Sequence, residues 1–173
     1  RLDPTKLLKV LMKCIDKMNI RKIEDKVIRI KKNTNSCKQK WKIYLESNNY
    51  INQDYIVICS ALNTEKLLKP LGHHVILDPI LGQVVELKLE NNNLNWNQWP
   101  AILNYQSINF IHFDPNHMTI GATIEIGTKP NLLFKKEMLN MNDSAPEWLT
   151  KATIKKEWSG IRARPRNEPS PLL

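Results

Sequence analysis

Residues 110–120 of this 173-residue chain read Phe-Ile-His-Phe-Asp-Pro-Asn-His-Met-Thr-Ile. Apolar residues at both ends of the stretch enclose Asp114-Pro115-Asn116. These residue types favour tight turns, because proline presets φ and because Asp and Asn hydrogen-bond to their own backbone. The stretch therefore predicts a β-hairpin, in which two strands run antiparallel.

Other strands are predicted on both sides of this hairpin by β-branched, alternating or continuous apolar residues. The expected strands cover residues 27–30, 41–45, 55–59, 84–89 and 152–158. The run at 55–59 is apolar throughout and is typical of a strand buried on both faces, with Cys59 as a small core residue.

Helical spacing is present in three further stretches. Asp3-Pro4 fits a helix cap followed by proline at the first helical position, and the apolar residues from Leu7 to Met18 recur every three to four residues. Residues 64–68 predict a short helix, and residues 132–149 carry helical spacing. Helices mixed with antiparallel strands indicate the α+β class.

The composition excludes several classes of protein. No apolar run approaches the roughly 18 residues of a membrane-spanning helix. The five glycines are too far apart for a G-x-G-x-x-G dinucleotide turn or a glycine-rich phosphate loop within this chain. Three cysteines without C-x-x-C spacing argue against a disulfide framework and make a reducing cytoplasm the default location.

The net charge of +9 is concentrated at the start, where residues 1–42 hold 14 Lys or Arg against 4 Asp or Glu. Such a segment either binds an anionic partner or forms a solvated helix face. The regular spacing of Lys6, Lys9, Lys13 and Lys17 favours the solvated face. No nucleic-acid motif is present, so nucleic acid is the less favoured partner.

Five short stretches, spread over nearly the whole chain, carry a resemblance to a known family. They are Leu2–Leu8, Asp54–Ala61, Pro79–Gln83, Gly121–Glu125 and Trp158–Arg162. In this order they resemble the flavin-dependent amino-acid oxidases, the family of glycine oxidase, sarcosine oxidase and D-amino-acid oxidase. The third stretch is similar to the family's Pro-x-Arg-Gly-Gln, and the fifth to its Trp-x-Gly-x-Arg.

The resemblance implies a middle fragment of an FAD-dependent oxidoreductase, because in the family the dinucleotide-binding turn precedes the helix at Leu2–Leu8. Residues 1–78 would form part of the FAD-binding domain, residues 79–157 the substrate-binding sheet and helix, and residues 158–173 a return segment. The implied α+β fold is a mixed, largely antiparallel sheet with flanking helices. The fragment alone is expected to be inactive.

The resemblance also implies roles for four residues. Arg162 would bind the carboxylate of a small amino acid or amine substrate, since arginine meets a carboxylate with two parallel hydrogen bonds. The substrate would then lose a hydride from Cα to the flavin and become an imine, which water hydrolyses. Val27 would touch the adenine part of FAD through its backbone, Ala61 would lie where the backbone approaches the cofactor, and Gly160 would let the chain pass close to a flat ring.

Plainer interpretations stay open for these positions. Arg162 would otherwise belong to a solvated basic tail, and Gly160 to an ordinary bulge. Leu81 stands where the family usually has arginine, and Ala61 where it usually has glycine. The alternatives to an enzyme are therefore a degenerate oxidase-like protein and a non-catalytic basic binding module. Self-association of the chain is also open.

Overall fold

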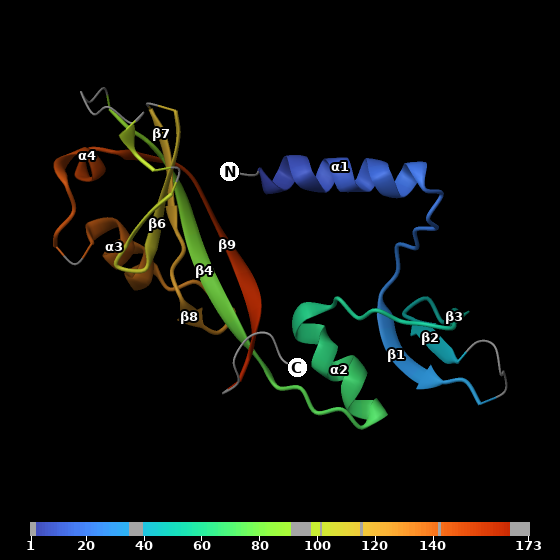
Figure 1. Cartoon of the computed structure of the whole chain (residues 1–173). Coiled ribbons are helices and arrows are strands. Elements are labelled where there is room, and N and C mark those ends of the chain that lie inside the picture. The colour runs from blue at the N-terminus through green and yellow to red at the C-terminus, as the bar shows by residue number, and fades with distance from the viewer. Residues whose placement is uncertain are drawn as a thin grey trace. The chain divides into compact units, whose positions relative to one another are not determined.

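Every strand pair that the structure describes is antiparallel, as the hairpin at 110–120 predicts. The computed structural model describes residues 3–34, 40–90, 98–100, 102–114, 116–141 and 143–166. The chain forms two units, one of residues 1–58 and 66–73, the other of residues 59–65 and 74–173 (Figure 1). Its mixture of helices and antiparallel sheets confirms the α+β class.

The N-terminal helix α1, Pro4–Lys17, confirms the predicted helix in the first unit. Asp3 caps α1, because its side chain accepts hydrogen bonds from the backbone N–H groups of Thr5 and Lys6 at 2.9 and 3.1 Å. These bonds satisfy amide groups that the helix's own ladder leaves unpaired. α1 contributes no buried side chain among the described residues.

The first unit also contains a three-stranded sheet, in the order β1-β2-β3. Its strands are β1 (Val27–Lys32), β2 (Trp41–Leu45) and β3 (Tyr50–Gln53). β1 and β2 confirm two predicted strands. Ile30 and Leu45 are buried and form the apolar centre of this small sheet.

The predicted short helix is α2, Thr64–Leu68, which is confirmed. A single 3₁₀ turn lies on each side of it, η1 (Ala61–Asn63) before and η2 (Lys69–Leu71) after. Gly72 ends η2 with φ +87°, a conformation that glycine adopts without strain. Among the described residues, no helix combines the length and the apolar character needed to cross a membrane.

The predicted strand at 55–59 is wrong. This stretch pairs with no described strand, and the side chains of Tyr55 and Val57 are 83% and 86% exposed. Cys59, expected in the core, is exposed as well. An apolar run becomes a buried strand only where neighbouring strands pair with it and cover it, and periodicity alone does not reveal such neighbours.

Six strands form the sheet of the second unit, in the order β5-β6-β7-β4-β8, with β9 pairing the remaining edge of β4. They are β4 (Leu77–Lys88), β5 (Leu103–Tyr105), β6 (Ile108–Asp114), β7 (His117–Gly121), β8 (Glu125–Ile126) and β9 (Thr153–Pro165). β6 and β7 are the predicted hairpin. β9 continues beyond the expected end at residue 158, so the segment with Arg162 is a strand and not an irregular tail.

Helices α3 (Leu132–Asn140) and α4 (Glu147–Thr150) lie on the same side of this sheet (Figure 1). They replace the single helix predicted over 132–149, because Met141 turns the chain with φ +49° and Pro146 precedes α4. The helices and the sheet enclose a core of Val85, Leu87, Leu89, Phe110, Met118, Ile120, Met138, Met141 and Leu149. Side chains alternate along β4, so Gly82, Val84 and Glu86 face the opposite side of the sheet.

Candidate functional site

The pairing of β4 with β9 gathers the sequence-predicted residues of the second unit (Figure 1 shows the two long strands, green and red, side by side). Gly82 lies directly opposite Gly160, and Ile80 directly opposite Arg162. Residues opposite each other in an antiparallel pair point to the same face. Arg162 therefore lies next to a pair of glycines without side chains, Gly82 and Gly160, on the face opposite α3 and α4.

The guanidinium group of Arg162 lies beside Gly82. Its Nη2 atom lies 3.4 Å from the position that a Cβ atom on Gly82 would take. Arg162 is exposed, and its side chain forms no hydrogen bond or ion pair with the residues that the structure describes. Its donors are therefore available to an anion.

A second arginine of the same region is already paired. Arg166 donates to the carboxylate of Asp78 through Nε, at 3.0 and 3.1 Å to the two oxygens, and through Nη2. The hydrogen bonds from Arg166 hold the pKa of Asp78 below its ordinary value. Of these two arginines, only Arg162 has a guanidinium free of carboxylate contacts among the described residues.

Gly160 has no structural need to be glycine within the described chain. Its φ is not in the left-handed region, and a Cβ atom built on it would meet nothing within 4 Å. Gly82 differs, because a Cβ there would meet the Ala122 Cβ and the Thr123 carbonyl oxygen, each at 3.0 Å. A strand glycine with open space beside it is typical of a place where a ligand approaches the backbone closely.

Ala61 lies in η1, which packs against β4 and β9 and so belongs to the same unit as Arg162. Its φ is +47°, in the left-handed region that disfavours residues with a Cβ atom. Val27 lies in the other unit, at the start of the edge strand β1. Its contact with adenine stays a prediction.

Replacing Ala61 by glycine is expected to stabilise the protein by about 1 kcal/mol, because glycine removes the strain of the left-handed conformation. The free energy of unfolding from urea titration measures this gain. Ala163→Gly is the matched control: Ala163 lies within β9 without a positive φ, so the added chain entropy should destabilise the protein by about 0.5–1 kcal/mol. Equal effects at both positions would contradict the strain at Ala61.

A buried polar cluster that no sequence pattern indicated lies under the glycine pair. Gln83, Thr123 and Glu125 are 6%, 7% and 4% exposed. Gln83 Nε2 donates to Glu125 Oε1 at 2.8 Å, the Thr123 hydroxyl donates to the same oxygen, and the Asn131 backbone N–H donates to Oε2 at 2.8 Å. Burial raises the pKa of Glu125, but hydrogen bonds from Thr123, Gln83 and Asn131 outweigh it and leave the pKa lowered. All three clustered side chains lie in stretches that carry the family resemblance, yet their types do not reveal that they are buried together.

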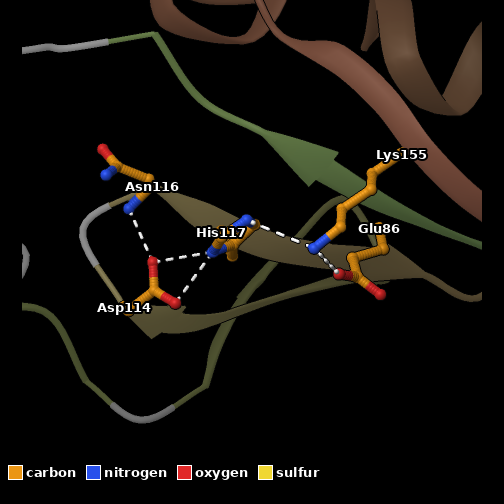
Figure 2. A network of polar contacts seen from close by, with 5 residues as sticks. All are labelled: Glu86, Asp114, Asn116, His117 and Lys155. Atoms are coloured by element: carbon orange, nitrogen blue, oxygen red, sulfur yellow. Dashed lines mark hydrogen bonds and ion pairs between the residues drawn. The ribbon is translucent and has the colours of Figure 1, made fainter.

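His117 belongs to a separate network around the β6–β7 turn (Figure 2). Its Nδ1 lies 2.8 and 2.9 Å from the carboxylate oxygens of Asp114, and its Nε2 lies 3.4 Å from Lys155 Nζ. Lys155 also pairs with Glu86 at 3.5 Å, and the Asn116 N–H donates to Asp114. These contacts join the turn to β4 and β9, and the hydrogen bond from His117 is the main reason why the pKa of Asp114 is lowered.

The whole chain, residues 1–173, matches the protein family described as FAD dependent oxidoreductase, and the chain belongs to this family. No curated protein sequence matches it significantly. Its fold is similar to glycine oxidase from Geobacillus kaustophilus (17% identity, TM-score 0.66, 83% of this chain and 37% of that chain). It is also similar to iminodiacetate oxidase from Chelativorans sp. (21% identity, TM-score 0.64, 81% of this chain and 37% of that chain). The chain thus spans little more than a third of these structures.

The family implies FAD, and part of the site fits a flat ring. The open space at Gly160 leaves the backbone of β9 accessible, and no packing among the described residues accounts for the missing Cβ atom. The five glycines of the chain form no phosphate-binding turn. The residues present therefore fit close contact with a ring system, whereas this chain carries no glycine-rich cradle for the pyrophosphate.

Proposed function

We propose that this chain supplies the substrate-carboxylate site of an FAD-dependent oxidoreductase that oxidises a small amine or amino acid. The observation that carries the proposal is the guanidinium of Arg162, which lies beside Gly82, is exposed and is unpaired among the described residues. A planar guanidinium binds a carboxylate through two parallel hydrogen bonds and stays charged at any working pH.

Arg162 contributes to the reaction by positioning. It holds the carboxylate at one end of the substrate, so the neighbouring Cα–H bond has one orientation over the glycine pair. When bound, FAD supplies the acceptor for the hydride. The substrate loses that hydride from Cα and a proton from nitrogen, and water hydrolyses the imine to a carbonyl compound and ammonia, or an amine where the substrate nitrogen carries an alkyl group. Gly160, Ala61 and the backbone of Val27 are the residues assigned to the cofactor.

The departures from the family pattern at Leu81 and Ala61 do not remove this site. Leu81 is 1% exposed, lies opposite Glu125 in the β4–β8 pair and points to the core side, away from Arg162. Ala61 introduces local strain but no side chain beside the guanidinium contact at Gly82. These changes bear on stability and cofactor contact, and they leave the carboxylate-binding residue in place.

Flavin reduction tests the proposed function. Because the chain spans about 37% of its structural relatives, the test uses the complete protein loaded with FAD. Anaerobic mixing with glycine, sarcosine and D-alanine is expected to bleach the flavin absorbance with at least one of them. Methylamine, which lacks the carboxylate of glycine, serves as the matched negative. If the protein retains FAD but none of glycine, sarcosine and D-alanine bleaches its absorbance, the proposal is overturned.

A further inference from the structure

The segment between β7 and β8, residues 122–124, is held against β4 at a single residue. The Gln83 N–H donates to the Thr123 hydroxyl at 2.8 Å, and the Thr123 N–H donates to the Gln83 carbonyl at 3.2 Å. The segment itself has no strand assignment. Gly121 and Glu125, on either side of the segment, pair with Val84 and Leu81 of β4, and within the segment these two hydrogen bonds fix how residues 122–124 lie against β4.

The buried carboxylate of Glu125 orients the Thr123 hydroxyl. A hydroxyl has one proton, and Thr123 donates it to Glu125 Oε1, which leaves a lone pair for the Gln83 N–H. Glu125 is held in turn by Gln83 Nε2 and by the Asn131 N–H. Because these groups are buried, no water replaces a bond that is lost. Thr123, Gln83 and Glu125 thus form one connected unit, the buried polar cluster.

The opposite side of this unit is the surface under the Arg162 guanidinium. Gly82 precedes Gln83, and Ala122 precedes Thr123. A Cβ atom on Gly82 would lie 3.0 Å from both the Ala122 Cβ and the Thr123 carbonyl oxygen, and 3.4 Å from Arg162 Nη2. The guanidinium therefore lies beside Gly82 and the 122–123 backbone, which the buried polar cluster holds together.

We infer that Thr123 is a positioning residue for Arg162: through the buried polar cluster it fixes the surface over which the guanidinium meets the substrate carboxylate. This inference rests on the proposed function. A displacement of residues 122–124 by a fraction of an ångström moves that surface relative to the guanidinium. Binding of a carboxylate through two hydrogen bonds tolerates only small changes in the position of the arginine.

Thr123→Val in the complete, FAD-loaded protein tests the inference, because valine keeps the shape of threonine and removes only the hydroxyl bonds. The apparent KM for carboxylate substrates is expected to rise about tenfold, with a smaller change in kcat. Thr123→Ser retains a hydroxyl and should restore the KM. Thr119→Val is the matched control, since Thr119 is also a buried threonine of this sheet and takes no part in the cluster.

A second variant approaches the same surface from the other side. Gly82→Ala places a methyl group 3.0 Å from two atoms of residues 122–123 and should raise the KM in the same way. Binding of acetate, followed by the NMR signal of the Arg162 Nε–H group, provides a readout independent of turnover. Both Gly82→Ala and Thr123→Val should weaken this binding, and Gly82→Ala decides the matter if the valine variant does not fold.

The outcomes separate this inference from the proposed function. If Arg162→Ala leaves carboxylate binding unchanged, the proposed function fails. If Arg162→Ala weakens binding but Gly82→Ala and Thr123→Val do not, or if Thr119→Val has the same effect as Thr123→Val, the positioning role of Thr123 is overturned while the proposed function stands.

Discussion

Arg162→Ala is expected to raise the apparent KM of the complete protein for its carboxylate substrate by about 100-fold, because two charge-assisted hydrogen bonds are together worth about 3 kcal/mol. The side chain of Arg162 is exposed and forms no hydrogen bond or ion pair with the described residues. The free energy of unfolding should therefore change by less than about 0.5 kcal/mol. Steady-state kinetics and urea titration measure the two quantities on the same preparations.

Arg164→Ala is the matched control for this variant. Arg164 carries the same charge two residues along β9, lies opposite Asp78 and is exposed. Its removal changes only the long-range field, which salt screens within about 10 Å at 0.1 M ionic strength. An equal rise in KM for Arg162→Ala and Arg164→Ala contradicts direct binding of the carboxylate by Arg162. So does a rise in the KM of Arg162→Ala that is as large for an amine without a carboxylate as for the carboxylate substrate.

The sequence predicts those parts of the fold that depend on contacts between neighbouring residues, such as helix caps and tight turns. Asp3 caps α1 through bonds to residues two and three positions away, and Asp114 and Asn116 bond within the turn that joins β6 to β7. Such signals need no knowledge of distant residues. The prediction of a buried strand at 55–59 was wrong because burial of this stretch would need partner strands, which a single apolar run does not specify.

The candidate site was predictable only in part for the same reason. Arg162 was found through the stretch Trp158–Arg162, but its surroundings depend on pairings between distant segments. Gly82 and Gly160 come together through the β4–β9 register, and Gln83 reaches Glu125 through contacts across 42 positions. The residue type of a glycine does not reveal that another glycine lies opposite it. The residue type of a glutamate does not reveal that its carboxylate is buried among hydrogen-bond donors.

Glu125→Gln is expected to destabilise the protein by about 2–3 kcal/mol at neutral pH. The amide keeps one oxygen but turns an NH₂ group toward a donor, either the Asn131 N–H or the side chains of Gln83 and Thr123, and a buried donor then lacks an acceptor. Urea titration measures the loss. Glu137→Gln on the exposed side of α3 is the control, and its effect should stay within about 0.5 kcal/mol.

The same substitution has a pH signature with a definite sign. The folded pKa of Glu125 lies below its ordinary value of 4.5, so the unfolded chain takes up the proton first as the pH falls. The stabilisation from the charged carboxylate is therefore complete above pH 4.5 and is lost as the pH drops through the lower folded value. Other carboxylates with lowered pKa values, among them Asp78 and Asp114, contribute to the acid response of both proteins and cancel in the difference. The gap in unfolding free energy between wild type and Glu125→Gln should consequently narrow below pH 4.5, whereas two parallel curves would mean that the hydrogen bonds to Glu125 do not favour its charged form.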